Sequence, residues 1–466
     1  MSISGGIYRR TYKNVPFVTM WRIPVGGETV ILPMSGTHDV TIDWGDGVIE
    51  DNVVMINPTH TYAAVGDYNI SINGSCDNWA FDNTGQREKI IGISQWGNLQ
   101  GMHDWSNAFF GCFNLETVTA TDSPTAPVSF DSMFLACTAL VMPPETGWWD
   151  TRTLRTTAHM FDGCSSMIEA PDTRNWFTAA LLNTNHMFST CGVMATAPSV
   201  ETWVTNQIAD MSHMFADCSA MTETPDVSGW DTSGATNMTS WMRGCSALTI
   251  EPDVEFWATQ NVVSMASMFS NCSGLVNPPN TSDWVLSSVT NTFSMFKGCA
   301  AMTVAPDTSR WNVARVSNMG SMFEGCTLMV NPPITSTWNT GTVNNMAAMF
   351  KNCLGMLDSP TSISWVTSQV TNTREMFRNC SNMVEFEVQN WNIRNLVDAT
   401  SMFEGSSLAS ADYNVLLLGW AGQAVKSGVP FHAGTAQYNG AGSVASAHNT
   451  LTNAPNNWVI MDGGPI

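Results

Sequence analysis

Apolar residues recur along most of the chain with a period of 27 residues. In one copy Val316, Met319, Met322 and Phe323 stand at i, i+3, i+6 and i+7, which is the spacing of side chains on one helix face. A Gly or Asn usually follows directly before a cysteine and suits a helix C-terminus with a left-handed residue. Beyond the cysteine, an apolar residue and then a proline indicate a short strand, because proline cannot donate to a ladder. The pattern predicts one helix and one short strand in each unit.

Two residue types keep this period without any insertion. The cysteine column consists of Cys137, Cys164, Cys191, Cys218, Cys245, Cys272, Cys299, Cys326, Cys353 and Cys380. The tryptophan column consists of Trp149, Trp176, Trp203, Trp230, Trp257, Trp284, Trp311, Trp338 and Trp365. An ungapped period of this length indicates the successive turns of a solenoid, in which identical side chains stack as structural ladders. We therefore expect an α/β repeat solenoid with one short strand and one helix in each 27-residue turn.

The two ends of the chain leave the period. Residues 17–76 alternate apolar and polar positions, as half-buried strands do, and predict an all-β unit. The tail predicts a helix, a strand, a second helix and a last strand, which would form a small α/β cap over the open end of the array. The expected organisation is an N-terminal arm (1–16), the β-sandwich (17–76), a bridge and N-terminal cap (77–105), a solenoid of about 12 repeats (106–408) and the C-terminal cap (409–466).

Charge and composition narrow the classes of partner. The 466 residues carry a formal net charge of −21 and only 12% charged residues. Nucleic-acid binding needs clustered Lys and Arg, and adhesion to an anionic membrane needs positive charge, so we expect neither. No apolar run is long enough to cross a membrane, and the N-terminal stretch lacks the apolar segment of a secretory signal.

The cysteine column has three possible explanations: a reduced buried ladder, disulfides or metal ligation. Parallel side chains on stacked turns hold the Cβ atoms too far apart for a disulfide. The clustered spacings of metal sites are absent. We expect a ladder of free, buried thiols, with Cys76 free as well, and no metal or cofactor. So many free thiols favour folding in a reducing compartment.

A few residues stand out against the repeat. His159, His186 and His213 share one column, which is either a polar surface position or, less favourably, a metal site. Trp148 precedes a ladder tryptophan and is an extra aromatic residue, which makes it a candidate, though not the favoured one, for an exposed contact with carbohydrate or protein. Asp46 and His60 are expected to be structural, with a bound ion as the alternative.

The N-terminal arm carries a small basic and aromatic cluster. Its members are Tyr8, Arg9, Arg10, Tyr12 and Lys13. Arg and Tyr are favoured at protein interfaces, so the cluster is either a docking arm for attachment or a frayed terminus.

No catalytic constellation is present in the sequence. The motifs G-x-S-x-G, H-E-x-x-H and G-x-G-x-x-G and the P-loop are all missing. We therefore expect a protein that is not an enzyme.

Several motifs together resemble a known family. The segments "FVTMW", "ISQWGN", the "MFxxC…P…W" units and the "LLLGWA…DGG" ending resemble the BspA-like leucine-rich-repeat surface proteins. The "WGDG" and "THTY" motifs resemble the PKD-like β-sandwich, an immunoglobulin-like module, and this resemblance implies an all-β immunoglobulin-like sandwich for residues 17–76. The resemblance implies a surface-displayed, non-enzymatic protein of the adhesin type. Relatives of this kind occur in bacterial envelopes and in bacteriophage genomes.

These considerations lead to a ranked set of functions. The first is a bacteriophage virion surface protein, such as a tail fibre, decoration or receptor-binding protein, because free thiols and a missing export signal suit assembly in the cytosol. The second is a secreted bacterial cell-surface adhesin, and the third is a glycan-active enzyme. The expected partners are other virion proteins or a second copy through the N-terminal region, and a host-surface protein or glycan through the solenoid or cap.

Overall fold

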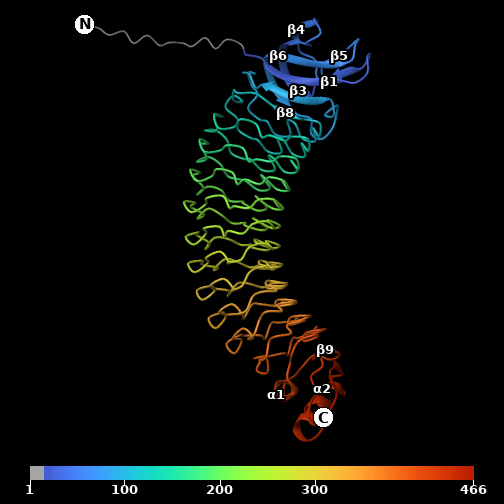
Figure 1. The fold of residues 1–466 in the computed structure, drawn as a ribbon, viewed down its shortest axis with the longest axis vertical. Coiled ribbons are helices and arrows are strands. Elements are labelled where there is room, and N and C mark those ends of the chain that lie inside the picture. Colours follow the sequence, from blue (N-terminus) through green and yellow to red (C-terminus); the bar gives the residue numbers. More distant parts are fainter. Residues whose placement is uncertain (1–14) are drawn as a thin grey trace, which may run out of the picture.

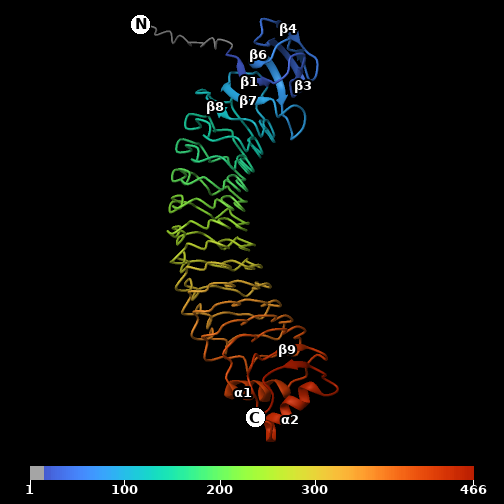
Figure 2. The ribbon, with the colours of Figure 1, turned by 45° about the vertical axis from the view of Figure 1, so that its right-hand side comes forward.

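The computed structural model describes residues 15–466, which form an elongated, curved stack of turns with a separate unit at each end. A β-rich unit closes the N-terminal end, and two helices lie at the C-terminal end (Figure 1). Figure 2 shows that neighbouring turns stack on one another along the array and that their orientation changes gradually as the stack curves. The basic cluster predicted as a docking arm (8–13) lies outside the described residues.

The N-terminal unit contains two sheets. The strands are β1 (Phe17–Ile23), β2 (Thr29–Ile31), β3 (Met34–Asp43), β4 (Ile49–Val53), β5 (Thr59–Thr61), β6 (Gly66–Trp79), β7 (Ile90–Gln95) and β8 (Thr117–Val118). Six of them form one sheet in the order β4-β3-β6-β1-β7-β8, and β2 pairs with β5. Neighbours in the large sheet are antiparallel except β7 and β8, which are parallel.

The large sheet continues from the N-terminal unit into the array. Met34 of β3 pairs with Trp79 of β6, so the predicted boundary at residue 76 falls inside a strand. Strands β7 and β8 belong to the segments predicted as bridge and first repeat, and they extend the same sheet. Apolar side chains of both sheets and of the array belong to one continuous core.

The predicted helix in each repeat is wrong. Within residues 106–408, all of which the structure describes, no helix forms. Two residues of each unit adopt left-handed backbone angles, for example Ser321 with φ of 55° and Gly325 with φ of 78°. A right-handed helix cannot contain them. The left-handed residue expected before the cysteine is confirmed, but it ends no helix.

Backbone hydrogen bonds explain why the helix-like spacing does not produce a helix. Alternate amide groups donate to the next turn, as Phe323 N–H does to the Met349 carbonyl at 2.9 Å. The amides between them donate three residues back, as Glu324 N–H does to the Ser321 carbonyl at 3.1 Å. Both sets of donors are satisfied, so the segment buries the same apolar side chains without i to i−4 bonds.

The predicted strand after each cysteine is wrong for the cysteine column, although β8 does follow Cys112. The regular series of parallel bridges lies instead before the Met-Phe pair, as in Asn291–Asn318 and Asn318–Asn345. Among the described residues, a bridge after a column cysteine occurs at Val304–Asn331. Each bridge remains isolated because the neighbouring amides turn back into local bonds, which prevents a longer ladder.

The cysteine and tryptophan columns are buried and stack from turn to turn. Each thiol from Cys137 to Cys380 donates to a carbonyl of the preceding turn, as Cys326 does to Phe296 at 3.2 Å. The Trp311 and Trp338 rings stack with centroids 6.3 Å apart and planes 1° from parallel. Several indole N–H groups also bond one turn back, as Trp284 does to the Val254 carbonyl at 2.8 Å. The ladders therefore satisfy buried polar groups as well as filling the core.

The C-terminal unit has the predicted order of elements. It consists of α1 (Ser410–Ala421), β9 (Pro430–His432), α2 (Gly442–Thr452) and β10 (Val459–Met461). Strands β9 and β10 pair in parallel, and an isolated bridge joins Phe431 of β9 to Ala399 of the last turn. Fully buried Trp420 of α1 donates its indole N–H to the Val388 carbonyl at 3.1 Å. The unit thereby covers the open end of the array.

Candidate binding surface

Trp148 lies on a tight turn that directs two successive tryptophans in opposite directions. The Trp149 amide donates to the Thr146 carbonyl at 3.0 Å and closes the turn. Trp149 is buried in the ladder with 2% of its surface exposed, whereas Trp148 is 79% exposed. Trp148, the candidate surface contact, is therefore open to solvent, and its role as a contact stays a prediction.

The following repeat holds this turn in place. The Thr146 hydroxyl donates to the Asp172 carbonyl at 2.6 Å, and the Trp176 indole donates to the Thr146 carbonyl at 3.0 Å. The Asn175 side-chain amide donates to the Gly147 carbonyl at 3.1 Å. Three bonds to a neighbouring turn leave the platform little freedom, which suits a preorganised contact site.

A second aromatic side chain lies beside Trp148. Phe177, in the next repeat, is 62% exposed, and its amide donates to the Thr151 hydroxyl at 2.7 Å. Trp148 and Phe177 line one open hollow of about 510 Å³, together with Gly147, Trp149, Asp150, Arg152 and Asn175. Phe177 was not predicted from the sequence as a contact residue. Its column holds Asp150 one repeat earlier and Val204 one repeat later, so an aromatic residue among variable neighbours was the available signal.

The charged groups around the hollow compensate one another. Arg152 binds Asp150 through two bonds of 2.7 and 2.5 Å, and Arg174 binds Asp172 through two bonds of 3.0 and 2.9 Å. The hydrogen bonds from the two guanidinium groups lower the pKa of Asp150 and the pKa of Asp172 below the ordinary value of an aspartate. This part of an acidic chain therefore carries paired rather than net charge.

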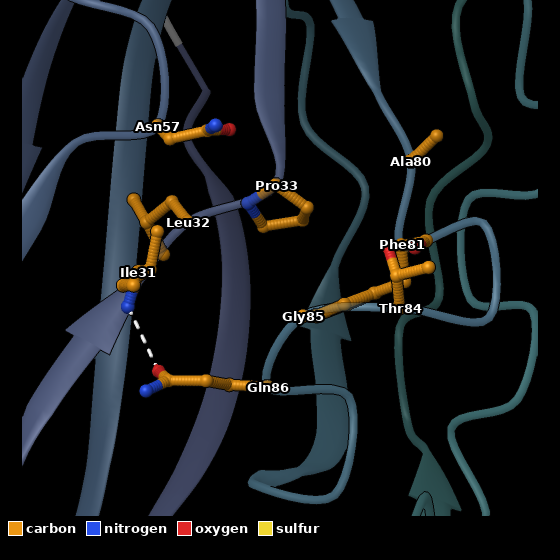
Figure 3. A pocket seen from close by; sticks show the side chains of 9 residues that line it. All are labelled: Ile31, Leu32, Pro33, Asn57, Ala80, Phe81, Thr84, Gly85 and Gln86. Carbon is orange, nitrogen blue, oxygen red and sulfur yellow. Dashed lines mark hydrogen bonds between the residues drawn. The ribbon is translucent and has the colours of Figure 1, made fainter.

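A smaller hollow of about 150 Å³ lies in the N-terminal unit (Figure 3). Its lining consists of Ile31, Leu32, Pro33, Asn57, Ala80, Phe81, Thr84, Gly85 and Gln86. The Gln86 side-chain oxygen already accepts a hydrogen bond from the Ile31 amide at 2.9 Å. None of these nine side chains carries a charge, so the hollow provides no acid, base or strong metal ligand.

Asp46 and His60 form a structural pair in the N-terminal unit. Their side chains meet at 2.7 Å, and the His60 ring stacks on Trp44 with centroids 4.9 Å apart. The Tyr62 hydroxyl donates to the Trp44 carbonyl at 2.7 Å and closes the same cluster. Burial would raise the pKa of Asp46, but its hydrogen bond with His60 lowers the pKa below the usual value. The pair is thus occupied in holding the "WGDG" turn.

The histidine column stacks along the array. The rings of His159 and His186 lie 4.4 Å apart, and those of His186 and His213 lie 4.2 Å apart, with planes within 14° of parallel. Parallel rings direct their nitrogen lone pairs in parallel, so they do not converge on one ion. Among residues 15–466 no group of three or more His, Cys, Asp or Glu side chains has metal-binding geometry. The metal alternative for this column therefore gains no support.

We expect acidification to destabilise this column. Burial, followed by repulsion from His213 and His159, lowers the pKa of His186 from 6.5 to about 4. Between pH 6.5 and pH 4 the unfolded chain therefore binds more protons than the folded chain. The contribution of neutral His186 to the stability of the folded state is complete above pH 6.5 and is lost as the pH falls towards 4. Because the ring is partly exposed, the expected loss is about 1–2 kcal/mol after allowance for solvent screening.

Urea unfolding at several pH values measures this loss. His186→Ser is a matched control, because Ser240 and Ser267 occupy the same column with left-handed angles of 56° and 57°. The variant should lose the contribution of His186 to the pH dependence between pH 6.5 and 4 and should keep that of His213, whose pKa is also lowered by burial. Equal slopes for the two proteins would contradict the assignment to His186.

The twelve cysteines are all buried and free. Burial raises the pKa of the column thiols above the ordinary value, to about 12 for Cys272 and Cys326. A thiol that remains protonated is a poor nucleophile and a poor metal ligand. The column therefore has a packing role and lies apart from the hollow at Trp148.

Comparison with known proteins places the chain in a repeat family. Residues 77–199, 192–307 and 294–415 each match a family described as "Mycoplasma protein of unknown function, DUF285". A solved structure of a leucine rich cell surface protein from Faecalibacterium prausnitzii A2-165 is 13% identical to this chain, and the match covers 64% of this chain and 87% of that protein, with a TM-score of 0.25. No curated protein matches the chain.

The part of the chain that the structure describes has no helix with the length and apolar character needed to span a bilayer. The three family matches agree with the resemblance to BspA-like repeat proteins. Together they extend from residue 77 to residue 415, which is more than half of the 466 residues, and the chain therefore belongs to the DUF285 family.

Proposed function

We propose that this chain is a non-enzymatic adhesion protein displayed on a bacterial cell surface, with the hollow at Trp148 as one of its contact sites. The observation that carries the proposal is the pair of neighbouring exposed aromatic side chains, Trp148 and Phe177, on turns held rigidly by the array. Aromatic residues and Arg are enriched at protein contact sites, and Arg152 lines the same hollow.

The contrast between inner and outer columns supports a binding role. The inner columns repeat Cys and Trp from turn to turn, because every turn packs on identical neighbours. The exposed position before the ladder tryptophan changes from Trp148 to Asn175, Thr202, Gly229 and Phe256 in successive repeats. Repeat proteins characteristically combine a uniform core with a variable outer surface that carries specificity.

Two further features favour contact over catalysis. Asp150 is the carboxylate of the hollow, and its ion pair with Arg152 keeps its pKa low, which is unsuited to general acid work near neutral pH. The net charge of −21 keeps an elongated particle soluble and suppresses non-specific adhesion to acidic surfaces.

The N-terminal unit is the proposed attachment end. Strand β4 is an edge of the large sheet, and Ile49, Val54 and Ile56 on and beside it are each at least 60% exposed. Exposed apolar side chains at the end of a sheet edge support contact with a scaffold or with a second copy, although the strand itself also carries Glu50 and Asp51. We propose a PKD-like relationship for this unit and a contribution from the basic cluster at residues 8–13.

Display on a bacterium is preferred because the description of the matched family names Mycoplasma, which is a genus of bacteria. A virion surface protein is the second candidate function. The observation that favours it is the set of twelve free buried thiols, which suits assembly in a reducing cytosol.

Surface labelling of intact cells of the source organism tests the proposal. Antibodies against the repeat array should bind intact cells, and added protease should remove the signal without lysing the cells. A signal that appears only after lysis contradicts display on the cell. Detection of the chain in purified virus particles instead would establish the second candidate.

A further inference from the structure

We propose that the hollow between Trp148 and Phe177 binds a neutral sugar ring of a glycan. This inference rests on the proposed adhesion function and specifies the ligand class for that surface. The occupant is a polyhydroxylated ring without net charge, presented on a neutral oligosaccharide or polysaccharide.

The two aromatic side chains of the hollow are available to pack on a sugar ring. Trp148 and Phe177 are 79% and 62% exposed, so most of each side chain is available to a ligand. Aromatic faces carry partial negative charge, and the C–H groups on one face of a pyranose ring carry partial positive charge. Two aromatic residues from adjacent repeats in one open hollow can therefore pack on such a ring.

The polar residues that line the hollow can form hydrogen bonds with the hydroxyl groups of a sugar. Sugar hydroxyls donate and accept hydrogen bonds, and the hollow contains both kinds of partner. The Asp150 carboxylate accepts, the Arg152 guanidinium donates, and the two hold each other in a planar bidentate arrangement. The Asn175 amide is oriented by its bond to the Gly147 carbonyl, which leaves its side-chain oxygen as an acceptor.

The charged side chains at the hollow neutralise one another, which favours an uncharged ligand. Asp150 and Arg152 cancel within the hollow, and the adjacent Asp172 and Arg174 also cancel. An acidic glycan or acidic peptide would find no net positive charge here, and the chain as a whole carries −21. A cationic partner would find no net negative charge within the hollow. Local neutrality is thus complementary to an uncharged ligand.

Hydrogen bonds between repeats hold the turns that form the hollow. The turn that carries Trp148 is bonded to the next repeat through Thr146 and Asn175, and Phe177 is bonded back to Thr151. A site that is already ordered loses little conformational entropy on binding. A shallow contact with a single sugar ring depends on this saving more than a large protein interface does.

Affinity electrophoresis and calorimetry with the full chain test the proposal. The probes are a panel of neutral oligosaccharides and polysaccharides built from glucose, mannose, galactose, xylose or N-acetylglucosamine, with an acidic polysaccharide for comparison. At least one neutral probe should bind the wild-type chain, and its affinity should change little with added salt because no net charge is neutralised.

Three single variants connect binding to the hollow. Trp148→Ala and Phe177→Ala should each lower the affinity at least tenfold. Phe256→Ala is the matched control, because Phe256 is 71% exposed in the same column as Trp148 but does not line the hollow, and its affinity should remain unchanged. Circular dichroism should show the same melting curve for all three, since each side chain is exposed.

Three outcomes overturn the inference: no neutral probe binds the wild-type chain, only the acidic probe binds, or the Trp148→Ala and Phe177→Ala variants bind as tightly as the wild type. Cell adhesion that requires Trp148 without any sugar binding would assign the hollow to a protein partner. If surface labelling of intact cells succeeds while sugar binding fails, the adhesion function stands and the ligand class is wrong.

Discussion

Replacement of Trp257 with alanine is expected to lower the free energy of unfolding by about 3–5 kcal/mol. Trp257 lies in the middle of the array and is 3% exposed. Its ring stacks on Trp230 at 6.1 Å and meets the edge of Trp241 at 4.8 Å, and its indole N–H donates to the Val227 carbonyl at 3.4 Å. Alanine removes these contacts and leaves a cavity between turns that cannot close without disturbing both neighbours.

Urea and thermal unfolding followed by far-UV circular dichroism measure this effect. Trp148→Ala is the matched control, because it removes the same side chain from the surface and should change stability by no more than about 0.5 kcal/mol. A repeat array transmits damage to neighbouring turns, so the Trp257 variant should also broaden the transition. Equal stability of the two variants would contradict the burial of the tryptophan ladder.

The thiols are expected to show an all-or-none change in reactivity on unfolding. In the native protein almost none should react with a thiol reagent, because all twelve cysteines are buried. Burial raises the pKa of Cys76 to about 11 and of Cys380 to about 12, so little reactive thiolate exists near neutral pH. After unfolding without a reductant, twelve thiols should react.

The two counts test separate statements. A native count close to twelve would contradict the burial of the column, and an unfolded count of two or fewer would show that the cysteines are paired in disulfides. Protein prepared with and without a reductant provides the control, and both preparations should give the same unfolded count.

The repeat, its buried ladders and the order of elements in the C-terminal unit could all be predicted from the sequence. A column such as Cys326 or Trp311 requires no tertiary information, because a constant period means that each residue packs on its own copy in the next turn. The exposure of Trp148 could also be predicted, because a second tryptophan beside a ladder position has no place in the core.

The local backbone could not be predicted, because the spacing of buried side chains does not specify which amides bond to which carbonyls. Val316, Met319 and Phe323 have helical spacing, yet left-handed angles at Ser321 and Gly325 send alternate amides to the next turn. Such bonds between turns exist only when a neighbouring turn supplies the carbonyl groups. The sequence of one unit favours a helix, and packing against its copies favours another arrangement.

The candidate site shows the same division. The chemistry of Trp148 could be inferred from its position in the sequence, but Phe177, Asp150 and Arg152 join it only through the turn geometry. Residues 27 apart become neighbours on adjacent turns of the array. Most of the residues between them lie elsewhere around the turn. Which outer side chains share one hollow therefore depends on the direction of each side chain from its turn, and the three-dimensional packing of adjacent turns sets that direction.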